Sequence, residues 1–85
     1  MPAFHLNIIT PQGTPYSGDI EHCLIPAENG FVGILANHAP YVTASSGGRV
    51  EIREVGGATQ KFQVGAGFFE VASNQATFLT QSFLR

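Results

Sequence analysis

Apolar and polar residues alternate along most of this chain with a period of two. In the opening segment, Phe4, Leu6 and Ile8 alternate with His5 and Asn7. Such alternation is typical of a β-strand with one buried face. It predicts strands over residues 4–10, 19–26, 31–35, 41–44, 49–54, 59–64, 67–72 and 75–80. No window combines helical spacing of apolar residues with a cap before it and a glycine after it, so no substantial helix is predicted.

Glycine and proline separate these segments. The chain has 10 Gly and 5 Pro, and turn signals recur about every eight to twelve residues, the spacing expected of an all-β sandwich or barrel. Pro15 is expected to delay the second strand until residue 19. The sequence therefore predicts an all-β fold, a flattened β-sandwich or barrel of about 8–10 short strands, in a single domain over residues 1–85.

Two hairpins in the second half of the chain have predictable registers. A three-residue loop over residues 55–57 and a two-residue loop over residues 73–74 fix how the flanking strands pair. The predicted cross-strand pairs are Val50 with Phe62, Glu51 with Lys61, Phe69 with Phe78, and Val71 with Ala76. Phe68 and Leu79 then lie together on the opposite face. A strand that is apolar on both faces is either buried on both or covered on its outer face by a partner.

Composition and charge narrow the classes of function. Hydrophobic residues make up 44% of the chain and charged residues 12%, with a formal net charge of −2. This balance excludes intrinsic disorder. The four Lys and Arg residues cannot neutralise a run of phosphates, so nucleic acid is not an expected partner. The apolar runs are too short to span a bilayer, so direct membrane insertion is not expected.

The residue types that most often carry chemistry form no recognisable site. His5, His22 and His38 lack the spacing of metal ligands. Cys23 lies in mid-strand among apolar neighbours, and we interpret it as a buried structural residue. The chain has no Gly-x-Ser-x-Gly nucleophile motif and no Gly-x-Gly-x-x-Gly phosphate loop. We therefore predict no catalytic residue, metal, cofactor or small-molecule substrate.

The stretch from Glu28 to Thr43 differs from the rest of the chain. It combines a turn, a strand in which Phe31 and Val32 are expected to be exposed, and a corner at Pro40. Proline fixes its own φ and restricts the residue before it, so this corner is expected to be rigid. Apolar residues held at a rigid corner suit a protein–protein contact. An ordinary sandwich corner with one exposed phenylalanine is the alternative interpretation.

Three motifs in colinear order carry a resemblance to a known family. They are residues 30–40 (Gly-Phe-Val-Gly-Ile-Leu-Ala-Asn-His-Ala-Pro), residues 48–52 (Gly-Arg-Val-Glu-Ile) and residues 65–71 (Gly-Ala-Gly-Phe-Phe-Glu-Val). The opening strand and residues 16–18 also fit, so the match covers nearly the whole chain. Together they resemble the N-terminal β-sandwich domain of the epsilon subunit of rotary F-type ATP synthase, which is called delta in mitochondria.

The resemblance implies that the protein catalyses no reaction itself. Members of this family belong to the central stalk, the rotor of the ATP synthase, and lie between the gamma subunit and the membrane-embedded c-ring. They help to couple proton flow to ATP synthesis. The resemblance thus implies a non-catalytic subunit, peripheral to an energy-transducing membrane on its cytoplasmic face, in a bacterial inner membrane or a plastid thylakoid.

The resemblance also implies two contact surfaces. The residues that match the ring-facing loop are Glu28, Asn29, Gly30, Phe31, Val32 and Gly33. Those that match positions beside gamma are Thr10, His38, Ala39, Pro40 and Thr43. Phe31 stands where the family more often has a polar or acidic residue, so the ring contact is expected to be more apolar here. Leu24 and Phe68 are further outward apolar candidates.

Most family members add a C-terminal pair of helices that restrains ATP hydrolysis. Nothing in these 85 residues corresponds to that helical hairpin, so helix-mediated inhibition is not expected from them. One alternative from another class is a free-standing β-sandwich that binds a carbohydrate or another small ligand. Such modules usually display aromatic platforms, whereas this chain has no Trp and 2 Tyr.

Overall fold

The structure, a computed structural model, describes residues 2–85, and Met1 of the predicted domain lies outside the described residues. This part of the chain forms nine strands and no helix. The strands are β1 (Phe4–Thr10), β2 (Gly13–Ala27), β3 (Gly30–Leu35), β4 (Tyr41–Ser45), β5 (Gly48–Glu54), β6 (Thr59–Val64), β7 (Gly67–Ala72), β8 (Gln75–Thr80) and β9 (Phe83–Leu84). Residues 2–85 contain no helix long and apolar enough to cross a membrane.

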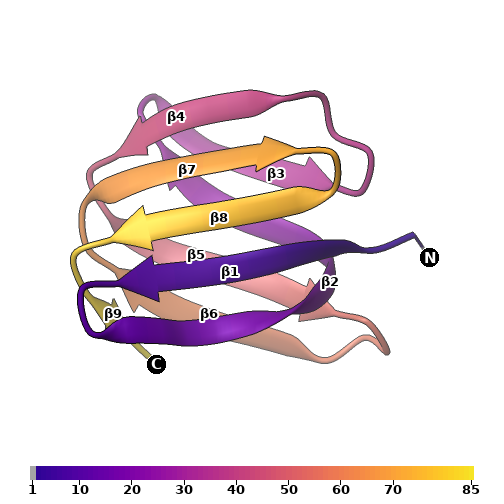
Figure 1. The fold of residues 1–85 in the computed structure, drawn as a ribbon, viewed down its shortest axis with the longest axis horizontal. Coiled ribbons are helices and arrows are strands. Elements are labelled where there is room, and N and C mark those ends of the chain that lie inside the picture. The colour runs from indigo at the N-terminus through magenta and orange to yellow at the C-terminus, as the bar shows by residue number, and fades with distance from the viewer. Residues whose placement is uncertain (1) are drawn as a thin grey trace.

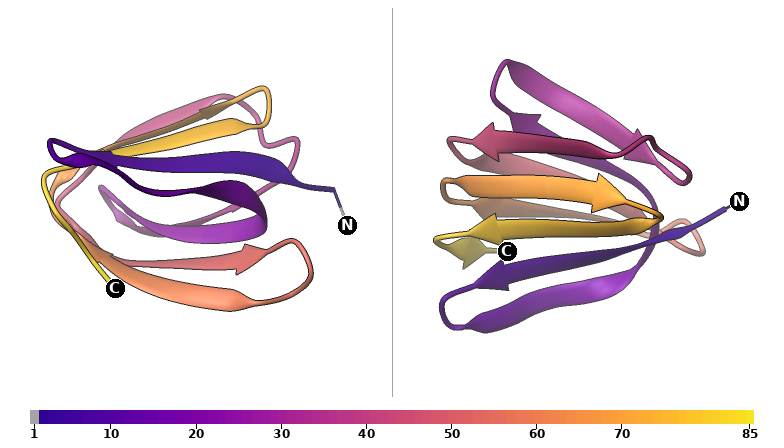
Figure 2. Two further views of the ribbon diagram at one scale, coloured as in Figure 1. Left: turned by 60° about the horizontal axis from the view of Figure 1, so that its bottom comes forward. Right: turned by 45° about the horizontal axis from the view of Figure 1, so that its top comes forward.

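One continuous sheet folds over on itself to give two layers (Figures 1 and 2). The strand order is β4-β7-β8-β1-β2-β5-β6-β9, with β3 paired to β2. We call β4, β7, β8 and β1 the first layer, and β3, β5, β6 and β9 the second layer. The long strand β2 belongs to both, because its first half pairs with β1 and its second half with β3 and β5. The predicted flattened sandwich is confirmed.

Strand β2 begins earlier than predicted. It starts at Gly13 rather than at residue 19 and includes Pro15. The prediction was wrong because strand pairing does not require a backbone N–H, which proline lacks, at this position. It lies across from a shift in the β1–β2 register between Ile8 and Thr10, where the regular ladder is interrupted. A proline is tolerated at such an irregularity.

The inward-facing residues of both layers form one core. Its buried members are Phe4, Leu6, Ile8, Tyr16, Ile20, Cys23, Ile25, Ile34, Val50, Ile52, Phe62, Val64, Phe69, Val71, Ala76 and Phe78. The predicted pairing of Phe69 with Phe78 is confirmed, and their ring centroids lie 6.1 Å apart. The pairing of Val50 with Phe62 is confirmed as well. Alternation along the strands therefore identified most of this core, whereas Tyr16 lies in the part of β2 that was not predicted as strand.

The connections between strands gather at two ends of the sandwich. At one end, which we call the Thr10 end, lie the β1–β2 and β2–β3 turns and the β4–β5 and β6–β7 connections (Figure 1). At the other end, the Asn74 end, lie the β7–β8 turn and the β3–β4 connection. Asn74 accepts a hydrogen bond from the backbone N–H of Asn37 there, at 2.6 Å. The positions of the candidate contact residues are given relative to these two ends.

Candidate interaction surfaces

The loop from Glu28 to Gly33 lies at the Thr10 end, at the turn between β2 and β3. The turn residues Glu28 and Asn29 are exposed, and Gly30 has a φ of 126°, which favours glycine. Phe31 is 53% exposed. The guanidinium of Arg49 lies 5.6 Å from the centroid of its ring, a cation–π contact that holds the ring on the outer face of the second layer.

Val32 is not outward-facing as expected. It is half-buried and packs against the core, because it pairs with Ile25, which is fully buried. Residues directly opposite each other on paired strands share a face of the sheet. Leu24 does face outward opposite Gly33, but it is half-buried. Phe31 is therefore the large exposed apolar side chain of this loop.

A hollow of about 300 Å³ separates this loop from strand β4. It is lined by residues 27–32 on one side and by Tyr41, Val42 and Thr43 on the other. The backbone N–H of Glu28 donates to Oγ1 of Thr43 at 3.4 Å. The structure thus places Thr43, a predicted gamma-side residue, beside the predicted ring-facing loop.

The His38–Ala39–Pro40 corner lies at the opposite end. Asn37 begins it with a φ of 65°, and the side-chain amide of Asn74 donates to Oδ1 of Asn37 at 3.1 Å. The ring of His38 packs edge-on against Tyr41, with 5.9 Å between centroids. These contacts fix the corner to the β7–β8 turn and to the start of β4, while Ala39 and Pro40 are exposed.

The predicted gamma-side residues therefore form no compact cluster. Thr10 lies at the end of β1, at the Thr10 end, whereas the His38–Pro40 corner is at the Asn74 end. Thr43 lies between them on the edge strand β4. Any single surface that includes all of them must extend along the first layer.

The outer side of the first layer carries an apolar row, of which only Phe68 and Leu79 were predicted from the sequence. Cross-strand pairing sets Ala44 opposite Phe68, Phe68 opposite Leu79, and Leu79 opposite Ile9. The row crosses four strands, a span of about 14 Å. Phe68 is 59% and Leu79 48% exposed. Together with Val42, which is 68% exposed on the same outer side, these residues form what we call the outer apolar face.

A shallow hollow at one end of this row includes Thr10. It is lined by Ile9, Thr10, Pro11, Gly67, Phe68, Leu79, Thr80 and Gln81. Phe68 and Leu79 were predicted from the sequence to share the outer face, whereas Ile9 and Val42 were not. A pair of adjacent apolar residues in a strand, such as Ile8 and Ile9, places one on each face of the sheet and could have identified Ile9. Thr10 thus lies beside the outer apolar face.

The Lys and Arg side chains belong to the second layer and its C-terminal end. Arg49 and Arg53 are on β5, Lys61 is on β6, and Arg85 follows β9. Arg49 and Arg53 contact Glu51 and Glu21 within 3.3 Å. On the four strands of the first layer, the acidic residue is Glu70, which is exposed. A partner for the outer apolar face therefore needs an apolar centre and gains from a basic rim.

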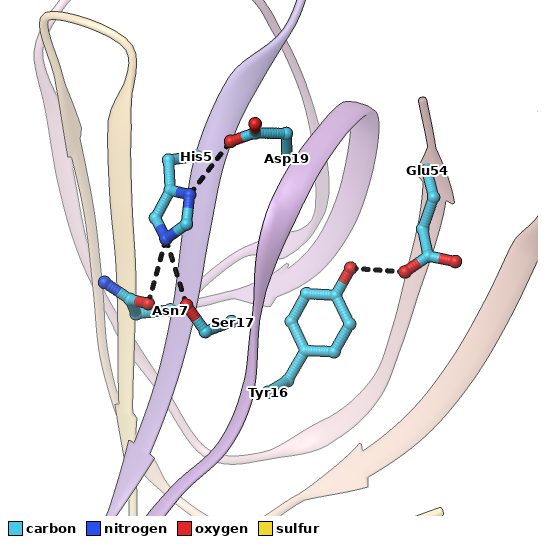
Figure 3. A network of polar contacts seen from close by, with 6 residues as sticks. All are labelled: His5, Asn7, Tyr16, Ser17, Asp19 and Glu54. Carbon is cyan, nitrogen blue, oxygen red and sulfur yellow. Dashed lines mark hydrogen bonds and ion pairs between the residues drawn. The ribbon is translucent and has the colours of Figure 1, made fainter. Parts of the chain in front are cut away.

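A polar cluster fastens β1 to β2 on the outer surface (Figure 3). Nδ1 of His5 lies 2.9 Å from Oδ1 of Asp19, and its Nε2 lies 3.0 Å from Oγ of Ser17 and 3.2 Å from Oδ1 of Asn7. The ring of His5 therefore contacts one side chain of β1 and two side chains of β2. Residues 2–85 contain no group of three or more His, Cys, Asp and Glu side chains that could hold a metal ion.

A second polar contact links the start of β2 to the end of β5. The hydroxyl of Tyr16 donates to Oε2 of Glu54 at 2.8 Å (Figure 3). This hydrogen bond lowers the pKa of Glu54 below its usual range, and burial, followed by the same bond, raises the pKa of Tyr16. Burial also raises the pKa of the Cys23 thiol to about 12. Cys23 therefore stays a neutral thiol at ordinary pH, as expected of a structural cysteine.

These shifts predict how stability depends on pH. The lowered pKa of Glu54 stabilises the fold above about pH 4, and this contribution is lost as pH falls through the folded-state pKa. The raised pKa of Tyr16 stabilises the fold as well. This stabilisation is fully present below about pH 10 and is lost as pH rises further. Tyr16→Phe should flatten both limbs of the curve. Urea unfolding from pH 3 to pH 11 measures this, and an unchanged curve would contradict the role of the Tyr16–Glu54 bond.

Comparison with known proteins gives consistent matches over almost the entire chain. The family described as the beta-sandwich domain of the ATP synthase Delta/Epsilon chain matches residues 3–85. The ATP synthase epsilon chain of Chlorobaculum tepidum is 39% identical over 79 residues, which are 93% of this chain and 90% of that protein. The epsilon chain of Bacillus pumilus is 39% identical over 82 residues, 96% of this chain and 62% of that protein.

Two solved structures share the fold at low sequence identity. A chain of the Euglena gracilis mitochondrial ATP synthase, solved as OSCP/F1/c-ring, superimposes with a TM-score of 0.89 at 21% identity. A chain of the Tetrahymena thermophila mitochondrial ATP synthase central stalk and c-ring gives a TM-score of 0.77 at 15% identity. The matches cover 99% and 94% of this chain, but 54% and 64% of those chains.

Proposed function

Because the chain belongs to the family of ATP synthase delta and epsilon chains, whose β-sandwich domain it matches over residues 3–85, we propose that it is a central-stalk subunit of a proton-translocating ATP synthase. Family membership over the whole fold is the observation that carries this proposal. The relatives are named as ATP synthase epsilon chains. These matches do not favour the alternative of a carbohydrate-binding module.

In this role the subunit binds between gamma and the c-ring and performs no chemistry itself. It rotates with both partners at the cytoplasmic face of an energy-transducing membrane and helps to couple proton flow to ATP synthesis. Such a rotor element must resist shear between its partners. A two-layered sandwich suits this requirement, because a close-packed core and paired strands deform little.

The outer apolar face is the surface that we assign to gamma. It lies on the side of the first layer, and Thr10 borders it at one end of the sandwich. The His38–Pro40 corner follows at the other end, joined to β4. This arrangement explains how residues at opposite ends can contact one partner. Its apolar centre supplies the desolvated contacts that dominate binding energy in protein interfaces.

The Glu28–Gly33 loop is the surface that we assign to the c-ring. It projects at the Thr10 end with polar residues at its tip and Phe31 beside them. Because the two surfaces meet at this end, one small domain can contact both partners at once. The assigned ring contact therefore combines polar turn residues with one apolar side chain.

A matched pair of variants on β3 tests the ring-facing assignment. Phe31→Asp should weaken binding to a purified gamma–c-ring subcomplex about tenfold, because a charge would replace an apolar contact. Leu35→Asp is the control, since Leu35 is also 53% exposed but lies near the Asn74 end of the same strand. Biolayer interferometry measures both. Equal effects of the two variants, or no effect of Phe31→Asp, would refute the assignment.

A second matched comparison tests the gamma-facing assignment. The double variant Phe68→Asp with Leu79→Asp should lower affinity for isolated gamma by about 100-fold. Leu84→Asp serves as its control, because Leu84 is 68% exposed but belongs to the second layer. Circular dichroism establishes that each variant is folded. If a folded double variant bound gamma like the unchanged chain, the outer apolar face would not be the gamma contact.

A further inference from the structure

Strands β3 and β4 each have a free edge, and the two edges lie on either side of a seam in the sandwich (Figure 2, right). Strand β3 pairs with β2 and β4 pairs with β7. Within residues 2–85, no backbone hydrogen bond joins β3 to β4. The hollow lined by residues 27–32 and Tyr41–Thr43 lies at this seam. The outer backbone groups of β4 therefore lack a strand to pair with.

The composition of this edge is unusual for an exposed one. Proteins protect free edges with charged side chains, prolines, bulges or very short strands. The other edge of the sheet, formed by β6 and β9, has such protection. Strand β9 is 2 residues long, Lys61 lies on β6, and Arg85 follows β9. Strand β4, by contrast, reads Tyr-Val-Thr-Ala-Ser and has no charge. Tyr, Val and Thr are strong strand formers, so this edge is well suited to accept another strand.

We propose that the free edge of β4 binds an extended segment of a partner protein, which adds a strand to the first layer. Backbone hydrogen bonds provide the affinity in this mode of recognition, and alternate side chains provide the specificity. One set of partner side chains would lie beside the exposed Val42. The other set would face Tyr41 and Thr43 at the hollow, whose lining also includes Glu28. A segment of about five residues matches the length of β4.

Charge at the edge indicates which segment fits. Glu28 is exposed, its backbone N–H donates to Oγ1 of Thr43, and the residue lines the hollows beside β4, so its negative charge belongs to this edge. Two copies of this chain paired about Thr43 would bring two Glu28 carboxylates together, which disfavours self-association. A basic residue in the partner segment would instead gain from the same carboxylate. The structure therefore favours, as the occupant, a strand whose only charged residue is one Lys or Arg.

Two synthetic peptides test this inference without any other subunit. Acetyl-Thr-Val-Lys-Val-Thr-Val-amide and its counterpart with Glu in place of Lys are titrated into the isotope-labelled chain and followed by NMR. We expect amide shifts centred on residues 41–45, with the Lys peptide binding about fivefold more tightly. Glu28→Lys should reverse this preference. Shifts elsewhere only, or the same affinity for both peptides, would overturn the inference.

Hydrogen exchange in the assembled enzyme separates this inference from the proposed function. In an ATP synthase that contains the chain, outward backbone amides of β4 should exchange at least about tenfold more slowly than in the isolated chain. Amides of β9 serve as the control and should change less. Assembly with unchanged β4 exchange would overturn strand addition but leave the stalk assignment intact. Dimers of the isolated chain that protect β4 would also overturn it, because the occupant would then be a second copy.

Discussion

Gly67→Ala is expected to lower the free energy of unfolding by about 3 kcal/mol or more, because the added methyl group has no space. A Cβ at Gly67 would overlap the backbone carbonyl oxygen of Leu79 and lie 2.8 Å from its carbonyl carbon. Backbone atoms cannot move aside as a flexible side chain does. Strands β7 and β8 would have to separate where Gly67 pairs with Thr80. For a domain of this size, the melting temperature should fall by roughly 15 °C.

Gly33→Ala is the control for this substitution. A Cβ at Gly33 would approach Nε2 of His22 at 3.3 Å, and this imidazole is the far end of a side chain that can adjust. The expected change in free energy of unfolding is below about 1 kcal/mol. Thermal melts followed by circular dichroism compare the two variants. Similar melting temperatures for both would refute the close approach of β7 to β8 at Gly67.

Phe69→Ala should destabilise the domain by about 3–5 kcal/mol, the usual cost of truncating a fully buried phenylalanine. Phe69 is 0% exposed, and its ring packs against Phe78 in the centre of the core. Its neighbour Phe68 is 59% exposed on the outer apolar face. Phe68→Ala should therefore cost below about 1 kcal/mol in the isolated chain while weakening gamma binding.

Urea denaturation of the two adjacent phenylalanine variants measures this difference directly. Both substitutions remove the same atoms from the same strand. They therefore differ only in which face of the first layer they affect. A larger stability loss for Phe68→Ala than for Phe69→Ala would show that the faces of β7 are assigned the wrong way round. It would also remove the basis for the outer apolar face.

Local alternation was enough to predict most of the fold. The hairpin registers, such as Val50 with Phe62, followed from loop lengths, because an antiparallel pair joined by a short turn admits few alignments. Pro15 misled the prediction of β2, since a register shift that removes the need for its N–H cannot be read from local sequence. The 2-residue strand β9 was not predicted, because Phe83 and Leu84 are too short a segment to show alternation.

The candidate surfaces were less predictable than the strands. The row through Ala44, Phe68, Leu79 and Ile9 depends on β1 lying parallel to β8 in the middle of the first layer. Strands far apart in sequence carry no loop length that fixes such a pairing, so Ile9 could not be placed beside Leu79. Val32 was misassigned because both Phe31 and Val32 are apolar, and alternation alone does not say which one faces the core.

Native mass spectrometry of the chain mixed with the purified gamma–c-ring subcomplex of its own ATP synthase tests the central claim most directly. If the domain is an adaptor held by both partners, one copy should bind each subcomplex, and the double variant Phe68→Asp with Leu79→Asp should bind far more weakly. No complex with the unchanged chain, under conditions in which gamma and the c-ring remain associated, would contradict the account.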